Sequence, residues 1–119
     1  MNPICIVDDE PSICSSIASI LKDDGYQAIV FPDAESFWEK LDTIEPSLAL
    51  LDIWLPGVDG VELLKRLHGR FPALPIIMMS GHAGIEAAVA AIKAGAYDFL
   101  EKPLHLEALL DKVKSALEH

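Results

Sequence analysis

Six side chains that could do chemistry stand at or just beyond the ends of short apolar runs in this sequence. Three acids follow the first run, one acid follows the third, a hydroxyl follows the fourth and an amine follows the fifth: Asp8, Asp9, Glu10, Asp52, Ser80 and Lys102. Carboxylates that share a site repel one another unless protons or a cation neutralise them. Oxygen ligands without His or Cys favour a hard ion, here Mg²⁺ or Mn²⁺. If the fold brings these residues together, they predict a divalent-metal site.

The same side chains imply a bound phosphate. Mg²⁺ in proteins is usually held by one or two carboxylates together with phosphate oxygens. Ser80 can donate a hydrogen bond to a phosphoryl oxygen, and Lys102 supplies a compact positive charge. Asp52 is then the candidate nucleophile, because a carboxylate that attacks phosphorus forms an aspartyl phosphate. We therefore predict phosphoryl transfer to Asp52, followed by hydrolysis by water.

The apolar runs that precede these side chains predict five strands. They are residues 4–7, 28–31, 48–51, 76–79 and 97–100. The first, third and fourth runs are continuously apolar, as expected for strands that are covered on both faces. The fifth mixes polar and apolar residues, which indicates a half-exposed strand at an edge of the sheet.

Helical patterns separate the predicted strands. Pro11 suits the first position of the first helix, Asp33 the N-cap of the second, and Gly25 and Gly95 the ends of the first and fourth. Alternating strands and helices predict an α/β fold, a doubly wound five-stranded parallel sheet with strand order 2-1-3-4-5 and five helices. Ligands of such a sheet bind beyond the carboxyl ends of the strands. Apolar residues recur at three- and four-residue steps in the segments 13–21, 34–41, 64–71, 85–92 and 106–117.

Length and composition exclude several other classes of protein. The 119 residues suit a single domain, and a hydrophobic content of 51% can form a core. A formal net charge of −10 would repel a phosphate backbone, so we expect no direct binding of nucleic acid. No apolar run approaches the roughly 18 residues of a membrane span, so we expect a cytoplasmic protein without a membrane partner. Cys5 and Cys14 are interpreted as buried thiols.

Four motifs, taken in order, resemble the receiver domain of bacterial two-component response regulators, which has a flavodoxin-like fold. They are Ile6–Glu10 (IVDDE), Leu51–Gly60 (LDIWLPGVDG), Met79–His82 (MSGH) and Gly95–Pro103 (GAYDFLEKP). The resemblance extends over residues 3–116. We therefore assign residues 1–117 to one receiver domain and interpret residues 118–119 as the remnant of an expression tag. The resemblance implies a signalling switch that catalyses only its own phosphorylation and dephosphorylation.

The resemblance also assigns roles to individual residues. It implies that Asp52 accepts a phosphoryl group from a sensor histidine kinase in a reaction that requires Mg²⁺. Asp9 and Asp52 would bind the metal directly, Asp8 through water, and Trp54 through its backbone carbonyl. The Trp54 side chain either shapes access to the acyl phosphate or covers apolar surface, and we favour the second role.

Ser80 and Phe99 form the switch that the resemblance implies. The Ser80 hydroxyl turns towards the phosphoryl group and Phe99 changes rotamer, which shifts the population between two packings. The Lys102–Pro103 peptide is commonly cis in this family. Partner contacts, including a phosphorylation-dependent homodimer, are expected on the fourth helix, fifth strand and fifth helix. The signal would pass to an effector outside this chain, by likeness a transcriptional output domain.

Two other functions stay open from the residues alone. A small Mg²⁺-dependent phosphatase would use Asp52 as its nucleophile on external substrates, although short connections leave little chain for a substrate pocket. A flavodoxin-like cofactor binder shares the strand order, but Asp8, Asp9 and Glu10 would repel a phosphate-bearing cofactor. Turnover of a generic phosphate ester would identify the first, and flavin absorbance the second. His82, two positions after Ser80, is a further candidate for the rim of the site.

Overall fold

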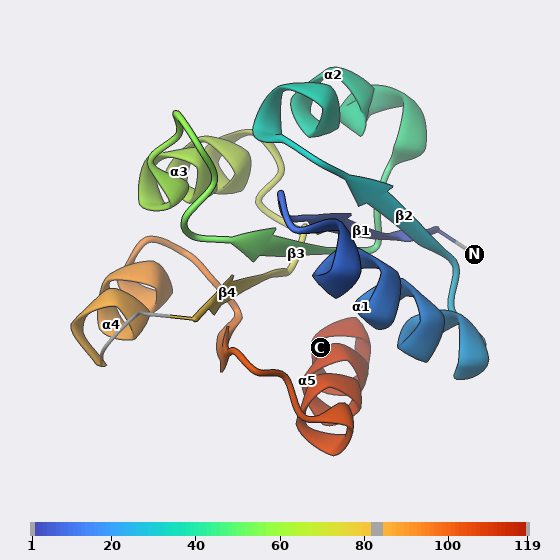
Figure 1. The fold of residues 1–119 in the computed structure, drawn as a ribbon. Helices are drawn as coiled ribbons and strands as arrows, with labels where there is room; N and C mark the ends of the chain where they lie inside the picture. The colour runs from blue at the N-terminus through green and yellow to red at the C-terminus, as the bar shows by residue number, and fades with distance from the viewer. Residues whose placement is uncertain (1, 82–84, 119) are drawn as a thin grey trace.

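The computed structural model describes residues 2–81 and 85–118, in which five strands and five helices alternate (Figure 1). The strands are β1 (Ile4–Val7), β2 (Ala28–Phe31), β3 (Leu48–Asp52), β4 (Ile76–Ser80) and β5 (Asp98–Glu101). The helices are α1 (Pro11–Asp23), α2 (Ala34–Ile44), α3 (Gly60–Arg70), α4 (Ile85–Lys93) and α5 (Leu106–Glu118). All predicted elements are therefore present. β3 and β4 extend one residue beyond their predicted ends, and β5 is shifted by one residue.

The strands form one parallel sheet in the predicted order β2-β1-β3-β4-β5. The register aligns the strand ends, because Val7 pairs with Leu51 and Asp52 pairs with Met79. β5 lies at an edge of the sheet, as its mixed composition predicts. Since all strands run the same way, the residues that follow β1, β3, β4 and β5 meet at one edge of the sheet.

Helices cover both faces of the sheet, which explains why its central strands are apolar throughout. α1 and α5 lie on one face, and α2, α3 and α4 lie on the other (Figure 1). Successive strand residues alternate between the two cores. In β1, Ile4 and Ile6 pack with α1 and α5, whereas Cys5 and Val7 pack with the other three helices. Every residue of β1, β3 and β4 is buried.

Local sequence signals set several helix bounds as predicted. The Oδ1 of Asp33 caps α2 by accepting a hydrogen bond from the Ser36 N–H at 2.7 Å. Pro11 is the first residue of α1, where an N–H would have no partner within the helix. Gly25 and Gly95 follow α1 and α4 with φ angles of +92° and +116°. Only glycine adopts such angles readily, so these residues let the chain leave each helix.

α4 differs from the other helices because its apolar stripe faces outwards. Ile85, Val89 and Ile92 are 83%, 44% and 46% exposed. The helix packs instead through small side chains, with Ala91 buried in the core that contains α2 and α3. The stripe is therefore exposed surface rather than core. No described helix, α4 included, is long and apolar enough to cross a membrane.

Both cysteines are buried free thiols, as predicted. Burial raises the pKa of Cys5 to about 12 and the pKa of Cys14 to about 11. Both side chains therefore stay protonated at neutral pH, where a thiol is a poor nucleophile and metal ligand.

Candidate functional site

Three of the predicted site residues are buried together at the carboxyl edge of the sheet. Asp8 follows β1, Asp52 ends β3 and Ser80 ends β4, and they are 1%, 4% and 0% exposed. Within the described ranges, no other polar or charged residue is buried. Polar groups are costly to bury, and the rest of the core is apolar. Their gathering at one edge therefore indicates a functional site rather than a requirement of packing.

The ammonium group of Lys102 lies among three carboxylates. Its Nζ is 2.7 Å from Asp8 Oδ2, 3.3 Å from Asp52 Oδ2 and 3.4 Å from Glu10 Oε1. The Lys102 backbone N–H donates to the Ser80 carbonyl at 2.8 Å, which ties the end of β5 to the end of β4. The Lys102–Pro103 peptide is cis, as the resemblance implies. The fold therefore brings Lys102 to Asp8 and Asp52 from opposite ends of the chain.

Burial and crowding oppose the negative charge of Asp52. Desolvation raises the pKa of its carboxyl and the charge of Asp8 adds to the rise, while the Trp54 N–H and Lys102 act against it. For Lys102, burial alone lowers the pKa, but its hydrogen bond to Asp8 and the charges of Asp52 and Asp8 together raise it. The amine is held charged beside a poorly solvated carboxylate. Further positive charge would stabilise this arrangement.

Asp8, Glu10 and Asp52 are placed to share a cation. Each offers a carboxylate oxygen, and these atoms lie within 4.8 Å of one another. The Glu10 N–H donates to Asp8 Oδ1 at 3.0 Å, which fixes the Asp8 carboxylate. A donor set made only of carboxylate oxygens fits Mg²⁺ or Mn²⁺. Lys102 supplies positive charge at the same three carboxylates.

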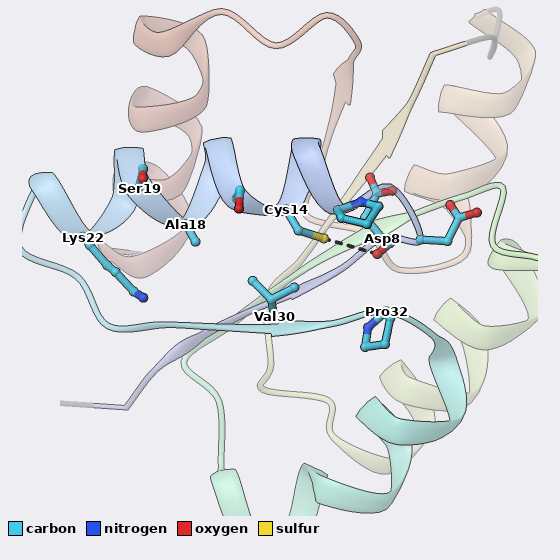
Figure 2. A pocket seen from close by; sticks show the side chains of 10 residues that line it. Asp8, Cys14, Ala18, Ser19, Lys22, Val30 and Pro32 are labelled. Carbon is cyan, nitrogen blue, oxygen red and sulfur yellow. Dashed lines mark hydrogen bonds between the residues drawn. The ribbon is translucent and has the colours of Figure 1, made fainter.

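Asp9 lies outside this group of three acids. It is exposed, and it lines a groove of about 450 Å³ that runs between α1 and β2 from Asp8 towards Lys22 (Figure 2). The Cys14 thiol donates to the Asp8 carbonyl at 3.2 Å and so joins α1 to the acidic turn. Direct metal binding by Asp9 stays a prediction. Glu10 is one of the acids that predict a metal site from the residues alone, although the resemblance assigns it no role.

Trp54 connects two of the buried site residues. Its backbone N–H donates to Asp52 Oδ1 at 3.0 Å, and its indole Nε1–H donates to Ser80 Oγ at 2.8 Å. The residue is 60% exposed, and the contact with Ser80 is additional to any apolar surface that the ring covers. The spacing of the sequence does not indicate this contact, because Trp54 and Ser80 are 26 positions apart. Metal binding by the Trp54 carbonyl stays a prediction.

The two predicted switch residues lie in different surroundings. Ser80 is at the acidic site, whereas Phe99 is half-buried on β5 and lines a shallow hollow with Val89 and Ile92 of α4. Phe99 pairs with Met78 of β4, the strand that ends at Ser80. Phe99 therefore lies between that strand and the exposed face of α4. His82 falls outside the described residues.

Comparison with known proteins identifies a family and several similar proteins for this chain. The family described as "Response regulator receiver domain" matches residues 4–114. The nitrogen assimilation regulatory protein NtrX of Azorhizobium caulinodans is 48% identical over 97% of the chain. The receiver domain of NtrX from Brucella abortus has 44% identity and a TM-score of 0.91, and covers 97% of this chain and 98% of its own. The beryllofluoride-activated NtrC4 receiver domain dimer has 36% identity and a TM-score of 0.94, with coverage of 99% and 98%.

The matched relatives include proteins much longer than this chain. The chain spans 26% of the length of the Azorhizobium protein, and 27% of a longer Brucella abortus NtrX chain whose structure is known. The matches support a signalling domain and give no support to the phosphatase alternative. Sequence, sheet order and site agree, and the chain belongs to the response regulator receiver domain family.

Proposed function

We propose that Asp52 is the phosphoryl acceptor of this receiver domain and that Ser80 and Lys102 hold the phosphoryl oxygens. The observation that carries the proposal is the burial of Asp52 beside Asp8 and the Lys102 ammonium. In the transfer, a carboxylate oxygen of Asp52 bonds to phosphorus as the bond to the donor's leaving atom breaks. The leaving group keeps the bonding electron pair. Hydrolysis by water later restores the carboxylate.

The acidic side chains would hold Mg²⁺, with Mn²⁺ as the alternative ion. The closeness of carboxylate oxygens from Asp8, Glu10 and Asp52, within 4.8 Å of one another, supports this proposal, and Asp9 and the Trp54 carbonyl are the further ligands that the resemblance implies. When bound, the ion supplies positive charge to the carboxylates and to the phosphoryl oxygens. Lys102 orients Asp8 and Asp52 in the absence of phosphate and offers its charge to the phosphoryl group afterwards.

The partners follow from the family of the chain. The phosphoryl donor is a sensor histidine kinase in the cytoplasm, and the output is a transcriptional effector domain in the same protein. The exposed residues Ile85, Val89 and Ile92, together with half-buried Phe99, provide a face for partners that includes α4 and β5. A second phosphorylated copy is one such partner, since a related NtrC4 receiver is an activated dimer. The acidic chain itself would not bind nucleic acid.

Intact mass after incubation with acetyl phosphate and Mg²⁺ tests the assignment. The wild-type chain should gain one phosphoryl group that is labile, and EDTA should prevent the gain. Asp52→Asn should abolish it. Asp59→Asn is the matched control, because Asp59 lies in the same loop but caps α3 at the protein surface through side-chain contacts that asparagine also makes.

Two results would contradict the proposal. A stable mass gain that persists in Asp52→Asn would place the phosphoryl group elsewhere. No gain with acetyl phosphate or with a histidine kinase would remove the acceptor role altogether. Size measurement on the same samples then tests whether phosphorylation produces a dimer through the α4 and β5 face.

A further inference from the structure

Trp54 holds an unusual position for a large aromatic residue at a buried polar site. The residue is 60% exposed, so burial does little to fix its ring. The indole N–H holds the ring by donating to Ser80, and the backbone N–H of the same residue donates to Asp52. One residue therefore connects the proposed phosphoryl acceptor with the hydroxyl on the neighbouring strand.

The donor and the acceptor of the hydrogen bond between the Trp54 indole and Ser80 differ in their access to water. The indole belongs to a mostly exposed residue, so its N–H can turn to solvent at little cost once it is released. Ser80 is 0% exposed, so its oxygen cannot exchange the indole for bulk water. A buried hydroxyl that loses a partner is costly unless another polar group replaces it. The bond therefore breaks readily only when the Ser80 hydroxyl gains a stronger hydrogen bond elsewhere in the site.

A phosphoryl group on Asp52 would offer the Ser80 O–H such a bond, with a phosphoryl oxygen as the acceptor. Asp52 pairs with Met79, the residue before Ser80, so the acceptor and the hydroxyl stand at the ends of adjacent strands. Charged phosphoryl oxygens accept stronger hydrogen bonds than neutral groups do. The Ser80 side chain has one oxygen on one rotatable bond, so turning the hydroxyl to a new partner also moves the oxygen that accepts from the indole.

We propose that the Trp54 indole is a latch that holds the Ser80 hydroxyl in its resting position and that phosphorylation of Asp52 opens the latch. Trp54 is thus a positioning residue that acts through Ser80. Opening the latch also frees an exposed aromatic ring, so phosphorylation changes the surface beside the end of β4. This inference rests on the proposed function, because it takes Asp52 as the acceptor.

The first test follows the two indole N–H resonances by NMR on the folded chain. Beryllofluoride with Mg²⁺ serves as the phosphoryl mimic. The Trp54 resonance should move to the position of a solvent-exposed indole and exchange faster with water when the mimic binds. Trp38 is the internal control, because its ring is held on α2 by the guanidinium groups of Arg66 and Arg70, 5.0 and 5.6 Å from its centre. In Ser80→Ala, the Trp54 resonance should be at the exposed position before the mimic is added.

The second test measures affinity for beryllofluoride at saturating Mg²⁺. Trp54→Phe keeps an aromatic ring but removes the N–H, so the resting state loses its latch. The affinity should rise about fivefold, which corresponds to one ordinary hydrogen bond of about 1 kcal/mol. In a Ser80→Ala background the same substitution should change nothing, whereas a Ser80→Thr background, which keeps a hydroxyl, should retain the effect. A general structural role of Trp54 would not depend on that hydroxyl.

The outcomes distinguish a failure of the latch from a failure of the proposed role of Asp52 as phosphoryl acceptor. If no resonance of the wild-type protein responds to beryllofluoride and acetyl phosphate adds no mass, the acceptor role and the latch both fail. A second outcome is that beryllofluoride moves other resonances of the wild type, and not those of Asp52→Asn, while the Trp54 indole resonance does not move. In that case only the latch is wrong. An unchanged or weaker affinity in Trp54→Phe also overturns it.

Discussion

An aspartate lies just after β2 and another ends β3, and each accepts a backbone hydrogen bond from a residue shortly after it, yet their pKa values shift in opposite directions. Asp33 accepts a backbone hydrogen bond from Ser36 at 2.7 Å, and Asp52 accepts one from Trp54 at 3.0 Å. The pKa of Asp33 is lowered, chiefly by that backbone hydrogen bond. The pKa of Asp52 is raised, chiefly by burial, although its own backbone hydrogen bond acts the other way. A backbone hydrogen bond stabilises the anion at both positions, but at Asp52 the effect of burial outweighs it.

Enclosure accounts for the difference between the two aspartates. Asp33 is exposed and solvated, whereas Asp52 is 4% exposed and lies near Asp8. Water no longer screens the carboxylates at the end of β3, so their mutual repulsion persists in the folded state. A site under such repulsion is stabilised when a cation binds and neutralises part of the negative charge. Asp33 serves as a helix cap, while Asp52 is suited to react.

The largest expected effect comes from breaking the enclosure of Asp52. Gly60 begins α3 beneath the loop that follows β3, and a Cβ on it would lie 2.5 Å from the Ile53 carbonyl oxygen. The obstacle is backbone rather than a movable side chain, so Gly60→Ala should lower the free energy of unfolding by about 3 kcal/mol. Urea denaturation measures the loss.

A second glycine in α3 provides the matched control. Gly69 has nothing within 4 Å of its ideal Cβ position. Gly69→Ala should therefore leave stability unchanged or raise it by up to about 1 kcal/mol through helix propensity. Equal losses in the two variants would mean that the close approach to Ile53 does not maintain the end of β3.

Regular repetition made most of the fold predictable. Buried runs such as 4–7 and 48–52, separated by helical patterns, are sufficient to indicate a parallel sheet and its order. The surface of α4 was less predictable, because an apolar stripe indicates burial whether a core or a partner provides it. Ile85 and Val89 are exposed, whereas the smaller Ala91 is the α4 residue buried in the core.

The second largest effect is expected from removing the Lys102 ammonium, the cation that lies beside Asp8 and Asp52. The side chain of Lys102 is 10% exposed and its partner Asp8 is 0% exposed. Lys102→Met leaves buried carboxylates without their ammonium, so the free energy of unfolding in EDTA should fall by about 2 kcal/mol. Mg²⁺ should then stabilise the variant more than it stabilises the wild type, since no amine competes for the same oxygens.

Lys112 is the control for that substitution. It pairs with Asp98 at 2.9 Å, and both side chains are about one-third exposed. Lys112→Met should cost at most about 0.5 kcal/mol and should not change the response to Mg²⁺. A wild-type response to Mg²⁺ in Lys102→Met would show that the amine and the ion do not share the acidic group.

The sequence predicts the site residues that lie at the ends of strands. It does not predict contacts that depend on how far a side chain extends from a loop. Asp8, Asp52 and Lys102 meet because their strands are neighbours, which the strand order already implies. The indole contact of Trp54 with Ser80 depends on the path of the loop after β3, and no periodicity encodes that path. Glu10 reaches the group through the turn after β1, which brings the exposed carboxylate of the third acid of the motif, rather than the second, close to Asp8 and Asp52.

The smallest expected effect compares the two aspartates directly, by the pH dependence of stability in EDTA. For Asp52 the folded pKa is raised, so its charge opposes folding above that pKa, and the opposition disappears as the pH falls below the ordinary value of 3.8. Asp52→Asn should therefore melt a few degrees above the wild type at pH 7, with the difference closing at low pH. For Asp33 the folded pKa is lowered, so its charge stabilises the fold above 3.8, and this stabilisation is lost as the pH falls through the folded pKa.

Asp33→Asn should consequently differ from the wild type in the opposite direction. Asparagine keeps the capping oxygen, so only the contribution of the charge is lost and the melting temperature at neutral pH should fall slightly. That deficit should also close at low pH, because the wild-type carboxyl is then neutral as well. Thermal unfolding of both variants between pH 7 and pH 3 gives two differences of opposite sign that converge towards zero. Differences of the same sign would mean that enclosure is not what distinguishes the ends of β2 and β3, and that the backbone hydrogen bond dominates at both.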